Sequence, residues 1–125
     1  MEIINNYIRW CSRKYTHFIG IGGAGMSAIA AVLLDMGCKV SGSDLKLNGL
    51  ARKLRNKGAI ISEGHNGFNV KNTGIVVVSS AIPEDNPELK EAKRAGIPVI
   101  QRAEMLNIIM KMYMWQKLHW EQTIR

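Results

Sequence analysis

Residues 16–27 read Thr-His-Phe-Ile-Gly-Ile-Gly-Gly-Ala-Gly-Met-Ser, and this stretch decides the fold. Its first part is short and mostly apolar, which is typical of a buried β-strand. Residues 20–25 then match the pattern G-x-G-x-x-G, and residues 24–36 carry apolar side chains at helical spacing. A glycine loop that joins a strand to a helix predicts a diphosphate site, because the unpaired amides at the helix start face the anion.

The same alternation of strand and helix continues to residue 113, with glycine or proline near most changes of pattern. Further strands are predicted at residues 38–43, 59–61, 74–80 and 97–100. Helices are predicted at 24–36, in a basic stretch that ends at Gly58, at 87–95 and at 102–113. We therefore expect an α/β, Rossmann-like, doubly wound fold whose mostly parallel five-stranded sheet has helices on both faces.

The predicted inner faces of two helices follow from their spacing of apolar residues. The basic helix presents Leu47, Leu50 and Leu54. The last helix presents Met105, Leu106, Ile109 and Met112 or Tyr113.

Composition limits the class of protein. The 125 residues are 46% hydrophobic and 22% charged, which fits one globular domain, and the net charge of +7 favours acidic partners. The basic residues are spread over several helices without an aromatic platform, so nucleic-acid binding is not expected. Cys11 and Cys38 have no metal-ligand spacing, and no membrane span or signal peptide is apparent, so we expect a cytoplasmic protein without a metal site.

Asp44 supports a nucleotide site. It lies 19 residues after Gly25, at the end of the second predicted strand, where dinucleotide-binding folds place an acid that accepts a ribose hydroxyl. From the residues alone the ligand is a nucleoside diphosphate moiety, and NAD(P), FAD and a UDP-sugar all fit.

Five blocks in order give this sequence a specific resemblance over residues 16–113. They are residues 17–27, 40–44, 76–82 and 86–88, and residues 97–106 with Arg102 and Glu104. The segment resembles the N-terminal domain of the Mur ligase family, and within it the enzymes that join UDP-N-acetylmuramic acid to L-alanine. The resemblance implies that the glycine loop holds the UDP part of UDP-N-acetylmuramic acid. The site residues expected on this basis are Gly20, Gly22, Gly23, Ala24, Gly25, Met26, Ser27, Ser43, Asp44, His65, Ser79, Ser80 and Ala81.

Some of these candidates have competing structural interpretations. His65 lies in a loop and either donates to uracil or phosphate or is an exposed loop histidine. Arg102 and Glu104 either position the substrate or cap the last helix. His17, at the start of a strand, is expected to be structural, and Cys38 a small buried apolar residue.

The two ends of the chain depart from this pattern. Residues 1–15 form an amphipathic extension, for which a packed helix is favoured over a membrane-surface segment or a partner-binding arm. Residues 114–125 form an atypical tail, expected to lack regular order or to be held by a neighbour. Family members carry the ATP loop Gly-Thr-His-Gly-Lys-Thr-Thr there, whereas residues 117–123 read Lys-Leu-His-Trp-Glu-Gln-Thr.

Three hypotheses follow. The chain is a shortened ligase domain that binds UDP-N-acetylmuramic acid, without catalytic residues or cofactor of its own and inactive alone, since the family uses ATP and Mg²⁺. The second is an NAD(P)-binding domain of an oxidoreductase. The third is a non-catalytic interaction module that self-associates through its apolar termini.

Overall fold

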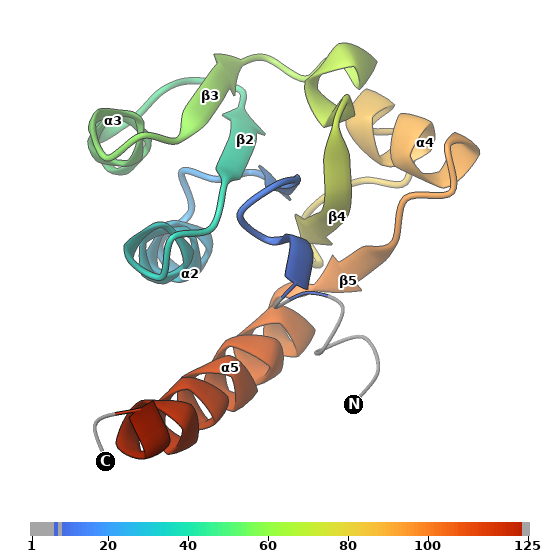
Figure 1. Ribbon diagram of the computed structural model, residues 1–125. Helices are drawn as coiled ribbons and strands as arrows, with labels where there is room; N and C mark the ends of the chain where they lie inside the picture. Colours follow the sequence, from blue (N-terminus) through green and yellow to red (C-terminus); the bar gives the residue numbers. More distant parts are fainter. Residues whose placement is uncertain (1–6, 8, 124–125) are drawn as a thin grey trace.

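The computed structural model describes residues 7 and 9–123 and contains one five-stranded sheet (Figure 1). All four strand pairings are parallel, and the strand order is β3-β2-β1-β4-β5. The strands are β1 (Tyr15–Ile19), β2 (Val40–Asp44), β3 (Ile60–Glu63), β4 (Thr73–Val78) and β5 (Val99–Gln101). The predicted α/β class and the five parallel strands are confirmed.

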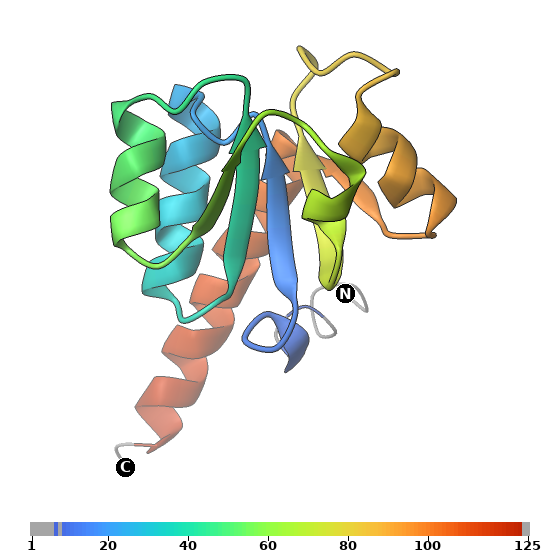
Figure 2. The ribbon, with the colours of Figure 1, turned by 90° about the horizontal axis from the view of Figure 1, so that it is seen from above.

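Helices cover both faces of this sheet, as predicted (Figure 2). The helices are α2 (Ala24–Asp35), α3 (Gly49–Asn56), α4 (Pro87–Arg94) and α5 (Arg102–Thr123), with a short 3₁₀ helix η1 (Gly67–Val70). α2, α3 and α5 lie on one face, and α4 lies on the other. This alternation of faces is the doubly wound arrangement.

Neighbouring residues of the central strands feed two separate cores. Phe18 packs among α2, α3 and α5, whereas Ile19 packs against α4. Val77 and Val78 divide in the same way. Because successive side chains of a strand point to opposite faces, a strand covered on both sides is apolar at most of its positions.

For two residues the prediction of a buried position on the inner face of a helix is wrong. Leu106 is 48% exposed, because the buried stripe of α5 is Met105, Ile108, Ile109 and Met112, and Leu106 lies beside it. Leu50 is 41% exposed at the first turn of α3, whose buried residues are Ala51 and Leu54. The predicted end of the last helix near Tyr113 is also wrong, since α5 continues through Thr123.

The described part of the N-terminal segment packs onto the sheet. Tyr7 is 1% exposed, and its hydroxyl forms a 2.7 Å hydrogen bond with Thr16 Oγ1. The Trp10 ring lies against Gly74, where an added Cβ would come within 2.6 Å of it. Residues 1–6 and 8 of the predicted extension lie outside the described residues.

The environment of Cys38 agrees with the sequence expectation. Cys38 is buried, and burial raises the pKa of its thiol, so it is an inert core residue as predicted. Across residues 7 and 9–123, no helix has the length and apolar character needed to cross a membrane.

Candidate nucleotide site

The candidate site lies where the chain reverses its direction of progress across the sheet. The first three strands run outward from β1 to β3, and β4 then returns to the other side of β1. The loops that follow β1 and β4 meet at the carboxyl edge, since a Cβ added to Gly20 would lie 3.4 Å from Ile82 Cδ1. Open α/β sheets bind ligands at this crevice.

The glycine loop is held in a tight turn by the end of β2. The amides of Gly20 and Ile21 donate to the carbonyl of Ser43 at 2.8 and 3.0 Å. Gly20 has a φ of +84°, which favours glycine. The N-cap of α2 is Gly23, and no side chain caps this helix, so the amides of its first turn remain available to an anion.

Arg102 brings a positive charge to this helix terminus. It is the first residue of α5, and its guanidinium lies directly over Gly25, so that a Cβ added to Gly25 would overlap Arg102 Nη1. Glu104 instead accepts a hydrogen bond from the Gln101 amide at 3.2 Å and so caps the start of α5. The sequence did not decide whether Arg102 and Glu104 position a ligand or cap the last helix. In the structure Arg102 lies at the glycine loop, and Glu104 caps the helix.

Asp44 and Asn48 hold the peptide at Gly22. The Gly22 amide donates to Asp44 Oδ2 at 2.8 Å, and Asn48 Nδ2 donates to the Gly22 carbonyl at 2.9 Å. Asn48 also caps α3 by accepting from the Ala51 amide. A Cβ at Gly22 would lie 2.8 Å from Asp44 Oδ2 and 3.0 Å from Asn48. The absence of a side chain at Gly22 thus makes room for these two side chains.

Sequence reasoning missed Asn48. Its signal was present, because Asn48-Gly49 precedes a helical stretch and asparagine is a preferred N-cap. The second role, in which the same amide reaches the glycine loop, depends on the tertiary placement of α3.

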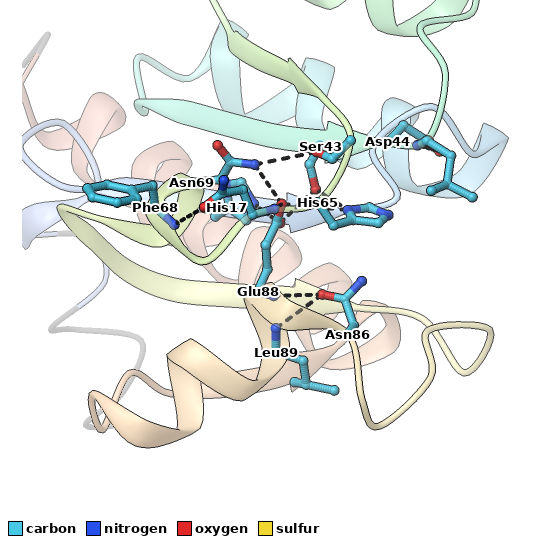
Figure 3. Close-up of polar contacts among 12 residues, drawn as sticks. His17, Ser43, Asp44, His65, Phe68, Asn69, Asn86, Glu88 and Leu89 are labelled. Atoms are coloured by element: carbon cyan, nitrogen blue, oxygen red, sulfur yellow. Dashed lines mark hydrogen bonds and ion pairs between the residues drawn. The ribbon is translucent and has the colours of Figure 1, made fainter.

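A buried carboxylate organises the polar groups beneath the site (Figure 3). Glu88, at the first turn of α4, is fully buried. Its Oε1 accepts from His17 Nε2 and Ser43 Oγ, both at 2.6 Å. Its Oε2 accepts from the Asn66 amide at 3.1 Å and from Asn69 Nδ2 at 2.7 Å. Two acceptor oxygens therefore meet four donors.

These hydrogen bonds keep Glu88 ionised. Burial alone would raise the pKa of the carboxyl, but hydrogen bonding and attraction from His17, with the Ser43 hydrogen bond, lower the pKa to about 2. Sequence reasoning treated Glu88 only as an early acid of its helix. The partners of Glu88 are distant in the sequence, so no local pattern around the first turn of its helix could reveal them.

The remaining predicted residues differ in their burial and in their hydrogen-bond partners. His17 is buried and structural, since its other ring nitrogen, Nδ1, lies 2.8 Å from Ser41 Oγ. His65 Nδ1 lies 2.9 Å from Ser43 Oγ. Met26 and Ser27 are buried, and the Ser27 hydroxyl donates to the Ala24 carbonyl, so these two residues face the site only through their backbone.

The loop after β4 contributes residues 79–81. β4 ends at Val78, so Ser79 and Ser80 follow the strand and do not lie within it. The Ser79 carbonyl accepts from the Ile82 amide at 3.2 Å, which forms a turn, while Ser80 and Ala81 are exposed. Among the described residues, no group of three or more His, Cys, Asp or Glu side chains is placed to hold a metal ion.

Comparison with known proteins places this geometry in a family. Residues 15–114 match the model described as "Mur ligase family, catalytic domain". The UDP-N-acetylmuramate–L-alanine ligase of Acidobacterium capsulatum is 54% identical over 96 residues, which are 77% of this chain and 21% of that protein. The ligase of the same name from Pelobacter propionicus is 55% identical over 96 residues, with the same coverage.

A solved structure shows the same fold. UDP-N-acetylmuramate–alanine ligase MurC from Thermotoga maritima superposes with a TM-score of 0.75 and 31% sequence identity, over 80% of this chain and 23% of that one. The chain thus spans about a fifth of the length of the curated relatives it matches.

Proposed function

Since the chain belongs to the Mur ligase family, we propose that it binds UDP-N-acetylmuramic acid through the UDP moiety, as the N-terminal domain of a peptidoglycan-synthesising ligase. The diphosphate is held by the first-turn amides of α2. The observation that carries this proposal is the Arg102 guanidinium over Gly25, because it adds a positive charge to a helix N-terminus that no side chain caps.

Several named relatives support this choice of ligand. The matched ligases act on UDP-N-acetylmuramate, according to their names.

The predicted site residues take distinct positions in this proposal. Residues 20–25 surround the diphosphate, Asp44 and His65 face the nucleoside, and residues 79–81 border the crevice at β4.

Our proposal includes no ATP site among the described residues. Residues 117–123, where the resemblance would place the ATP loop, lie within α5. Backbone amides inside an α-helix are occupied by i→i−4 hydrogen bonds, so they cannot cradle a phosphate. The family uses ATP and Mg²⁺ for ligation, and we propose only the sugar-nucleotide binding step for these residues.

Isothermal titration calorimetry with UDP-N-acetylmuramic acid, UDP and NADH tests the proposal. UDP-N-acetylmuramic acid and UDP should bind, and NADH should bind more weakly than either. Tighter binding of NADH than of UDP would favour the oxidoreductase hypothesis, which Asp44 at the end of β2 also fits.

Arg102→Ala provides the matched test of the site. Loss of a charge-assisted contact to the diphosphate should weaken UDP binding by about tenfold to a hundredfold. Arg94→Ala is the control, because Arg94 lies on α4 and its Nε donates to Glu91 Oε1 at 2.8 Å, away from the glycine loop. Equal losses in both variants would indicate a general charge effect and contradict the assignment of Arg102.

A further inference from the structure

The hydrogen bonds around Glu88 determine where the protons of the cluster lie. An ionised carboxylate only accepts hydrogen bonds, and both oxygens of Glu88 already take two donors each. One of these donors is the Ser43 hydroxyl, at 2.6 Å. Ser43 therefore donates its only hydroxyl proton to Glu88.

His65 contacts Ser43 on the remaining side. Because Ser43 Oγ has no second proton, the 2.9 Å contact requires His65 Nδ1 to donate and Ser43 to accept. His65 Nδ1 therefore carries a proton. Among the described residues, no hydrogen bond involves the opposite ring nitrogen, Nε2, and 14% of the side chain is exposed.

The negative charge of Glu88 is more closely engaged with the other histidine. His17 Nε2 lies 2.6 Å from Glu88 Oε1, whereas His65 Nδ1 lies 3.6 Å from Oε2. Glu88 is therefore closer to His17 than to His65. An imidazole that carries its proton only on Nδ1 has a lone pair on Nε2 and can accept a hydrogen bond there.

We propose that the Glu88–Ser43 pair fixes His65 as the Nδ1–H tautomer, so that Nε2 accepts a hydrogen bond from a hydroxyl or imide N–H of the ligand and does not bind a phosphate oxygen. The ligand part of this inference rests on the proposed function. His65 is thereby a specificity-determining residue for the nucleoside part of the ligand, and Ser43 and Glu88 are positioning residues.

The position of His65 in the fold suits this role. Ser43 is the link, because its hydroxyl contacts His65 while its carbonyl holds the amides of Gly20 and Ile21. Ser43 thus connects His65 to the glycine loop, and Figure 3 shows His65 and Asp44 near Ser43. A ligand whose diphosphate sits at α2 would extend its nucleoside toward this acceptor.

Long-range ¹H–¹⁵N NMR of the full chain near pH 7.5 tests the tautomer directly, because it separates protonated from unprotonated ring nitrogens. The expected spectrum shows His65 protonated at Nδ1 and unprotonated at Nε2, with His17 protonated at Nε2. His119→Gln removes the third histidine from the spectrum. A His65 ring that is protonated at Nε2, as the other tautomer or as the imidazolium, would overturn the proposal.

Two serines provide a matched pair of variants. Ser43→Ala should release His65 from the single tautomer, and Ser43→Thr, which keeps the hydroxyl, should restore it. Ser41→Ala removes the hydroxyl that contacts His17, so it should leave the His65 signals unchanged. If Ser43→Ala retains the Nδ1–H tautomer of His65, Ser43 does not direct it. If that variant does not fold, the wild-type spectrum and Ser43→Thr still decide.

Binding of two probes tests the selectivity. His65→Leu should weaken UDP about tenfold and leave inorganic pyrophosphate unchanged, because pyrophosphate at neutral pH offers no hydroxyl or imide donor of a nucleoside. Equal weakening of both probes would place His65 on phosphate and contradict this inference. If wild-type chain binds neither probe, the proposed function fails, whereas the tautomer result stands on its own.

Discussion

Replacing Glu88 with glutamine should destabilise the fold strongly without changing the volume of the side chain. Glutamine keeps one acceptor oxygen, but an NH₂ group replaces the other. This NH₂ donor would face N–H donors that hydrogen-bond to the carboxylate in the wild type. Each pH unit between the ordinary pKa of 4.5 and the folded value of about 2 corresponds to about 1.4 kcal/mol. The ionised carboxylate therefore contributes on the order of 3 kcal/mol to folding at pH 7, and Glu88→Gln should cost a comparable amount.

The sign of the pH dependence follows from the lowered pKa. The contribution of Glu88 is fully present above about pH 4.5 and is lost as the pH falls toward 2, because the unfolded chain takes up the proton first. In wild type, ¹³C NMR of the carboxyl carbon should show Glu88 ionised well below pH 4.5. A carboxyl that titrates near 4.5 would contradict the interpretation.

Urea unfolding at pH 7 measures the cost of Glu88→Gln, and Glu91→Gln on the same helix is its control. Glu91 is paired with Arg94 at the surface, and surface ion pairs contribute little, so its variant should unfold at the wild-type midpoint. If Glu88→Gln also unfolds at that midpoint, with the same slope, the four hydrogen bonds do not stabilise the fold as argued.

Further predictions follow from close contacts. Gly22→Ala should lower both stability and UDP affinity, since the methyl group displaces Asp44; Asp44→Asn should weaken UDP less in calorimetry, because its amide oxygen still accepts one hydrogen bond. Gly74→Ala should cost about 1–3 kcal/mol in urea unfolding, as its Cβ would lie 2.6 Å from the Trp10 ring; an unchanged midpoint would show that the ring is free to move. The chain should self-associate through the exposed apolar side of α5, and Met110→Glu should reduce the concentration dependence of sedimentation, whereas a wild-type monomer at high concentration would exclude it.

Local sequence patterns predicted the elements whose signals are local. The glycine loop, the cap at Asn86 and the uncharged strand predicted at 74–80 each follow from adjacent residues. The structure contains all three, with the strand at Thr73–Val78. The cap is clear in the structure, where Asn86 Oδ1 accepts from the amides of Glu88 and Leu89. These patterns sufficed for the fold class.

Contacts between distant parts of the sequence were not predictable in this way. Glu88 meets His17 across 71 positions, and Asn48 reaches Gly22 across 26. No spacing rule links such pairs, since each depends on how α3 and α4 dock on the sheet. The prediction of the buried face of α5 was wrong for a related reason. Residues 105–115 are apolar except at Asn107 and Lys111, so periodicity alone does not choose Ile108 over Leu106.

Mapping of backbone amide shifts during a titration with UDP-N-acetylmuramic acid tests the central claim most directly. The account predicts saturable changes that are largest at residues 22–26 and at Arg102, with smaller changes at Asp44 and His65. An alternative location exists, a cavity of about 530 Å³ between η1 and α4 that Lys71 helps to line and to which no residue of the glycine loop contributes. Changes centred on that cavity, or none that saturate, would contradict the assignment of the diphosphate to the glycine loop.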